Sequence, residues 1–103
     1  MMTEKRETPR MPVVLDAMLN FRATAVMCTV RDISLGGAFV EATPEDLPYS
    51  GEIELGISVN NNGASKYYRL PGKICRVTEG GAGIRFNGEG PDAYFSLVDL
   101  VYR

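Results

Sequence analysis

The sequence predicts an all-β fold with a C-terminal helix, in which six antiparallel strands close into a barrel. Three observations support this fold class. Segments rich in β-branched and aromatic residues recur along the chain, short turns separate them, and no helical pattern alternates with them before residue 91. Residues 1–11 are expected to form a flexible basic arm, and residues 12–103 a single barrel domain with its helix at about 91–102.

The first half of the chain contains three of the expected strands. Val13–Phe21 and Thr24–Arg31 are rich in strand-forming residues, and Asn20–Ala23 between them is short enough for a hairpin turn. The sequence DISLGG then predicts a turn, which a strand follows from about Ala38 to Ala42. The next stretch, TPEDLPYSG, contains two prolines and is predicted to be a surface loop.

The second half contains the other three strands. Polar and apolar residues alternate over Glu52–Val59, which is typical of a half-buried strand. Asn60–Gly63 is a strong turn signal, because asparagine and glycine tolerate positive φ. Lys66–Val77 is expected to pair back, with an interruption at Pro71–Gly72, and Ala82–Phe86 gives a short last strand.

From Pro91 onward the hydrophobic spacing becomes helical. Proline suits the first position of a helix, and Asp92 in the first turn favours the positive end of the helix dipole. One apolar face recurs at i, i+3, i+4 and i+7, formed by Tyr94, Leu97, Val98 and Val101. We expect this face to pack on the barrel rather than to bind a partner.

The overall composition excludes several classes of function. The chain is 45% hydrophobic and 23% charged, as folded domains are, and its net charge of −2 argues against a broad basic surface for a nucleic acid polymer. It contains no histidine and no C-x-x-C pair, so common zinc sites and nucleophile–base pairs cannot be assembled. The sequence therefore predicts no enzyme activity, no metal site and no cofactor.

The location and the cysteines are also predicted from composition. No apolar run approaches the roughly 18 residues that span a bilayer, and the charged N-terminus is unlike a signal peptide. We therefore expect a cytoplasmic protein without membrane insertion. Cys28 and Cys75 lie in predicted strands and are expected to be two buried, reduced thiols.

Two short motifs carry the candidate chemistry, Arg6-x-x-x-Arg10 and Asp32-x-Ser34-x-x-Gly37. Twenty-one residues separate them, which is about one hairpin. A strand of about eight residues runs roughly 26 Å outward, and its partner brings the chain back. The arm and the second motif should therefore meet at one end of the sheet.

The residue types in these motifs suit a guanine-containing cyclic dinucleotide. Arginine forks bind phosphate oxygens or the Hoogsteen edge of guanine, and an ionised Asp32 can accept hydrogen bonds from the guanine N–H groups. Ser34 can donate and accept, while Gly36 and Gly37 are expected to leave their backbone amides open. The same residues can also form an Asx- or Ser-type turn in which both glycines adopt positive φ, and the two interpretations are compatible.

The other arginines and the tyrosine pair are expected to have structural positions. Arg31, Arg76 and Arg85 alternate with apolar neighbours and should face outward from their strands. Tyr67–Tyr68 is expected to place one ring on the surface and one in the core rather than to stack on a ligand.

The chain resembles the PilZ domain family, whose pattern is R-x-x-x-R near the N-terminus followed by [DN]-x-S-x-x-G. The resemblance extends to LPGKICRV at Leu70–Val77, to GIRF at Gly83–Phe86 and to the terminal apolar helix, so that it covers nearly the whole chain. It implies a six-stranded antiparallel barrel that binds cyclic di-GMP.

The resemblance also implies a site and a mode of action. The residues assigned to the ligand are Arg6, Arg10, Asp32, Ser34 and Gly37, with Lys5 and Gly36 as further candidates. The two arginines would hold phosphate and guanine, and the second motif would recognise the base. Cyclic di-GMP would then order the arm, and an unidentified protein partner would read the new surface. The alternative is a PilZ-like adaptor that binds a protein of the pilus or motility machinery without nucleotide; the presence of both motifs argues against it.

Overall fold

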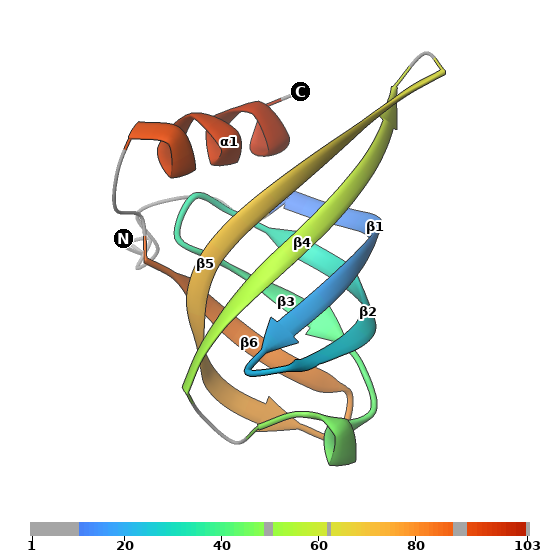
Figure 1. Ribbon diagram of the computed structural model, residues 1–103, viewed down its shortest axis with the longest axis vertical. Helices are drawn as coiled ribbons and strands as arrows, with labels where there is room; N and C mark the ends of the chain where they lie inside the picture. The colour runs from blue at the N-terminus through green and yellow to red at the C-terminus, as the bar shows by residue number, and fades with distance from the viewer. Residues whose placement is uncertain (1–10, 49–50, 62, 88–90, 103) are drawn as a thin grey trace, which may run out of the picture.

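The computed structural model describes residues 11–48, 51–61, 63–87 and 91–102 (Figure 1). Its elements are β1 (Met11–Phe21), β2 (Thr24–Ile33), β3 (Gly37–Glu41), the short 3-10 helix η1 (Pro44–Asp46), β4 (Gly51–Asn61), β5 (Ala64–Thr78), β6 (Gly81–Phe86) and α1 (Pro91–Val101). Six strands and one helix were predicted, and their order is confirmed.

The six strands form a closed antiparallel barrel in the order β1-β2-β3-β6-β5-β4. Tight turns connect β1 to β2 to β3, and β4 to β5 to β6, so each half of the chain is a meander. Two seams join the halves: β3 pairs with β6, and Ala17–Asn20 of β1 pair with Glu54–Ile57 of β4. This strand order confirms the predicted fold class. Closure also removes the open sheet edges that short hairpins alone would expose.

β5 continues without a break through Pro71 and Gly72, so the predicted interruption is wrong. Pro71 lies opposite Glu54 of β4, but its carbonyl oxygen accepts a hydrogen bond from the N–H of Asn87, 3.0 Å away. In an antiparallel strand the N–H and C=O of one residue point to the same side. The missing N–H of Pro71 therefore faces the end of β6, and no hydrogen bond to β4 is lost.

The core lies inside the barrel and follows the alternation of each strand. In β4 the side chains of Ile53, Leu55, Ile57 and Val59 are all buried, as the alternating sequence predicts. The largest fully buried side chains of the described residues are Leu19, Val30, Ile33, Val40, Leu55, Ile57 and Leu70. Each such side chain contributes about 1.5–3 kcal/mol to folding through its burial.

α1 lies across the end of the barrel at which β1 begins and β2 turns into β3 (Figure 1). Of the helix side chains that the structure describes, Leu97, Leu100 and Val101 are buried, Val98 is half-buried and Phe95 is exposed; the side chain of Tyr94 lies outside the description. Leu97 and Val101 of the predicted face are buried, and Leu100, which the predicted set did not include, is buried with them. No helix within the described residues is both long and apolar enough to span a membrane.

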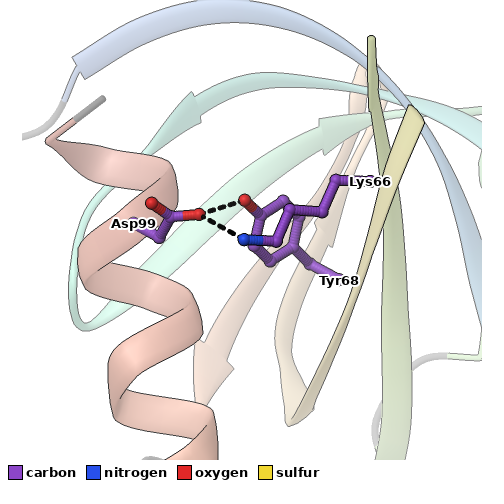
Figure 2. Close-up of polar contacts among 3 residues, drawn as sticks. All are labelled: Lys66, Tyr68 and Asp99. Carbon is purple, nitrogen blue, oxygen red and sulfur yellow. Dashed lines mark hydrogen bonds and ion pairs between the residues drawn. The ribbon is translucent and has the colours of Figure 1, made fainter. Parts of the chain in front are cut away.

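One carboxylate of α1 joins the helix to β5 (Figure 2). An oxygen of Asp99 accepts hydrogen bonds from Lys66 Nζ, 3.1 Å away, and from the hydroxyl of Tyr68. Burial of Tyr68 and its bond to Asp99 raise the pKa of that hydroxyl, and the bond to Asp99 raises the pKa of Lys66. Lys66 and Asp99 are about half exposed, so their ion pair contributes little to stability. The hydrogen bond from the hydroxyl of Tyr68 is the stronger polar contact between the helix and β5.

The tyrosine pair and the cysteines show how strand position decides burial. Tyr67 is exposed and Tyr68 is buried, as predicted. Both cysteines are free thiols, but only Cys28 is buried, so the prediction for Cys75 is wrong. The pairing of β5 with β6 shifts register between Ile74 and Arg76, and the extra residue, Cys75, is turned outward.

We expect a thiol reagent at pH 8 to label native protein at Cys75 and to leave Cys28 unmodified. Burial raises the pKa of Cys28 from 9.0 to about 11, so its reactive thiolate is scarce as well as inaccessible. Mass spectrometry of the labelled protein should show one adduct, and two after denaturation. A Cys75→Ser variant is the control and should show none while folded; an adduct at Cys28 in that variant would contradict the prediction.

The same shift makes stability depend on pH. Because the folded-state pKa of Cys28 lies above the unfolded value, the neutral thiol stabilises the fold fully below pH 9. That contribution is lost as the pH rises from 9 towards 11.

Candidate functional site

The start of β1 lies beside the second motif. Met11 pairs with Ile33, and Pro12 pairs with Asp32. The chain therefore enters the barrel next to the D-x-S-x-x-G turn, as the spacing of the motifs predicts. Arg10 directly precedes Met11 in the sequence; the basic residues Lys5, Arg6 and Arg10 of the arm lie outside the described residues.

A β-bulge places Asp32 on the outer surface of the barrel. Val30 and Ile33 are both fully buried, although two residues separate them, and the pairing with β3 shifts register between Val30 and Asp32. The bulge lets Arg31 and Asp32 both face outward, where strict alternation would turn one of them into the core. Asp32 is half-buried there, opposite Phe39 of β3.

Ser34 organises the turn from inside. Its side chain is buried, and its Oγ accepts hydrogen bonds from the N–H groups of Gly36 and Gly37, each at 3.2 Å. The hydroxyl also lies 3.3 Å from the carbonyl oxygen of Gly37, to which it donates. The predicted Ser-type turn is confirmed. The expectation that the two glycine amides are open is wrong, because the serine hydroxyl occupies both.

The two glycines serve the packing of β3 on β6. Neither has the expected positive φ. At Gly37 the reason for glycine is close approach, because a Cβ there would overlap the carbonyl oxygen of Ile84. The carbonyl oxygen of Gly36 accepts a hydrogen bond from the N–H of Phe86, 2.9 Å away. The turn is therefore anchored to the end of β6 at two consecutive residues.

The outer surface beside the turn is basic, although the chain carries a net negative charge. The three arginines predicted to face outward are all exposed: Arg31, Arg76 and Arg85. Arg31 forms an ion pair with Glu41 at 3.9 Å. Arg85 lies opposite Gly37 on one side and opposite Lys73 on the other. Arg85 and Lys73 therefore extend the basic surface from the second motif onto β5. The described residues contain no cluster of His, Cys, Asp or Glu that could hold a metal ion.

Sequence reasoning missed two outward residues near the motif, Phe39 and Lys73. Phe39 lies between the buried Ala38 and Val40, so it faces outward and is half-buried beside Asp32. Lys73 is exposed one residue before the buried Ile74. The signal that could have found both is the alternation of their strands, read together with the pairing of β3, β6 and β5.

Comparison with known proteins agrees with the fold. The chain is similar to the PilZ domain of CeSA from a cellulose-synthesizing bacterium, with a TM-score of 0.74 and 23% identity over 91% of this chain and 95% of that one. It is also similar to the inhibitor of motility MotI/DgrA of Bacillus subtilis, with a TM-score of 0.77 and 15% identity over 98% of this chain. The match covers 51% of that protein, about half its length.

The search of curated proteins finds no match. The family model for the PilZ domain matches residues 4–103, which include both motifs and all six strands. The chain therefore belongs to the PilZ domain family.

Proposed function

We propose that this chain is a cytoplasmic receptor for cyclic di-GMP and acts by binding rather than by catalysis. The observation that carries the proposal is the pairing of Met11 with Ile33 and of Pro12 with Asp32. This pairing puts Met11, the residue that follows the R-x-x-x-R segment in the sequence, beside the D-x-S-x-x-G turn. One ligand can therefore contact both motifs on the outer surface.

The two motifs have complementary roles in this proposal. Arg6 and Arg10 supply forked donors for the phosphates and guanine, and Lys5 adds positive charge. Asp32, half-buried on the outer face, accepts hydrogen bonds from guanine N–H groups. The buried Ser34 acts indirectly: it closes the turn that continues from Asp32.

The two glycines complete this turn. Gly36 and Gly37 seat it against β6, so that the ligand meets a rigid surface rather than a loop that must be ordered.

Ligand binding also provides a switch. A ligand held by the turn and by the arm binds more tightly when the arm is docked on the barrel, and this difference in affinity shifts the population towards the docked state. A partner protein then recognises the arm and barrel together.

Calorimetric titration with cyclic di-GMP tests the receptor. We expect saturable binding that GTP and cyclic di-AMP do not reproduce, and an affinity at least about tenfold lower for Arg10→Ala, because a charge-assisted hydrogen bond is lost. Arg22→Asn is the matched control: it removes one positive charge from the β1–β2 turn, at the opposite end of β1, and asparagine tolerates the φ of 55° found there.

An equal loss of affinity in Arg10→Ala and Arg22→Asn would reject a specific role of Arg10 in the site. The absence of heat from the wild-type protein at high micromolar ligand would reject the receptor. An adaptor that binds its protein partner without nucleotide, with the fold shared by the motility inhibitor MotI/DgrA, would then take its place.

A further inference from the structure

Four residues form one row across the outer surface of the barrel. Asp32 of β2 pairs with Phe39 of β3, Phe39 pairs with Gly83 of β6, and Gly83 pairs with Arg76 of β5. Neighbouring strands are about 4.8 Å apart, so the backbones of Asp32 and Arg76 are separated by about 14 Å. A carboxylate and a guanidinium thus stand at the two ends of a row that crosses the seam between β3 and β6.

The side chain of Arg76 lies along this row. A Cβ built on Gly83 would be 3.5 Å from Cγ and 3.6 Å from Nε of Arg76, so the arginine side chain lies over the bare backbone of Gly83. It extends from β5 over β6. Arg76 is exposed and, unlike Arg31, takes part in no ion pair among the described residues.

The middle of the row is apolar. Phe39 faces outward because Ala38 and Val40 on either side of it are buried in the core. The ring is half-buried, and the next position in the row is Gly83, which has no side chain. An aromatic ring beside bare backbone offers a surface on which a planar base can lie.

A guanine base matches both ends of this row. Its N1–H and exocyclic amine are donors and suit a carboxylate, whereas O6 and N7 are acceptors and suit the paired donors of an arginine. We infer that Arg76 is a specificity-determining residue, which donates hydrogen bonds to O6 and N7 of a bound guanine. The N–H groups of the same guanine donate to Asp32, and the base lies over Phe39. This inference rests on the proposed function, and it adds to the two motifs a residue on β5.

Adenine does not fit the same arrangement. It presents N7 as an acceptor but an amine in place of O6, so one of the two arginine donors would face another donor. Glutamine, by contrast, pairs well with N7 and the amine of adenine. Arg76→Gln therefore tests base selectivity as well as charge.

Arg85 provides the matched control. It is exposed on the same surface, lies opposite Gly37 and Lys73, and belongs to the neighbouring row, which does not contain Asp32. Arg85→Gln removes the same charge close to the same ligand. It should lower the affinity for any dianionic dinucleotide by a common factor.

The experiment measures the affinities of wild type, Arg76→Gln and Arg85→Gln for cyclic di-GMP and cyclic di-AMP, the latter by displacement of a fluorescent cyclic di-GMP. We expect Arg76→Gln to weaken cyclic di-GMP binding about tenfold or more and to reduce the ratio of the two affinities by a similar factor. Arg85→Gln should leave that ratio unchanged. The thermal midpoints of both variants should match the wild type, since both side chains are exposed.

Two outcomes separate this inference from the proposed function. If the wild type binds cyclic di-GMP and Arg10→Ala weakens it, but Arg76→Gln keeps the wild-type preference for guanine, the receptor stands and the role of Arg76 is rejected. If the wild type binds no cyclic di-GMP, the receptor fails and the role of Arg76 fails with it.

Discussion

Replacement of Gly81 by alanine is expected to lower the free energy of unfolding by at least about 3 kcal/mol. Gly81 begins β6 with a φ of 151°, a backbone conformation that residues with a Cβ rarely adopt. A Cβ there would also overlap the carbonyl oxygen of Val40, which belongs to the partner strand β3. Neither problem can be relieved by a side-chain rotation, because both involve the backbone. The strands would have to separate at the β3–β6 seam.

The neighbouring Gly80 is the control for this experiment. A Cβ at Gly80 would have no heavy atom within 4 Å, and its φ is not positive. We expect Gly80→Ala to be neutral or slightly stabilising, because alanine reduces the conformational entropy of the unfolded chain. Urea unfolding followed by circular dichroism measures both variants. Equal midpoints for Gly81→Ala and Gly80→Ala would show that the seam tolerates a side chain at position 81.

Replacement of Gly37 by alanine is expected to reduce both stability and ligand binding. The new Cβ would overlap the carbonyl oxygen of Ile84 and push the start of β3 away from β6, at a cost of about 2–3 kcal/mol. The turn built by Ser34 would move with it, because the N–H of Gly37 donates to the serine hydroxyl. We therefore expect Gly37→Ala to weaken cyclic di-GMP binding, although the N–H of Gly37 itself is already hydrogen-bonded to Ser34.

Urea unfolding and calorimetric titration of the same Gly37→Ala sample separate the two effects. Gly80→Ala serves again as the control, because it adds the same methyl group at the opposite end of β6. Wild-type affinity in a destabilised Gly37→Ala variant would show that the position of the turn does not matter to the ligand.

Much of this fold could be predicted from local sequence. Alternation over Glu52–Val59 identifies a half-buried strand, and the asparagine-rich stretch after it identifies a hairpin turn. The position of the start of β1 beside the second motif follows from chain length alone, since one hairpin separates Met11 from Ile33. These features depend on residues close in sequence, and local patterns describe them well.

The details that shape the site depend on contacts between strands. The bulges at Arg31 and Cys75 arise from the register of β2 with β3 and of β5 with β6, which no single segment specifies. For the same reason the exposure of Cys75 and the row that joins Asp32 to Arg76 could not be predicted. The Ser-type turn was predicted, but the residue types do not show that its hydroxyl binds both glycine amides, because they permit an open turn as well as a closed one.

The division of the barrel into two meanders has a consequence for how the chain folds. Each meander forms from contacts between successive strands, which close rapidly, whereas the β1–β4 and β3–β6 seams require residues about 40 positions apart to meet. Docking of the two halves is therefore the slow event. The row from Asp32 to Arg76 spans the β3–β6 seam, so a nucleotide bound across it would hold the halves together and slow their separation rather than speed their formation.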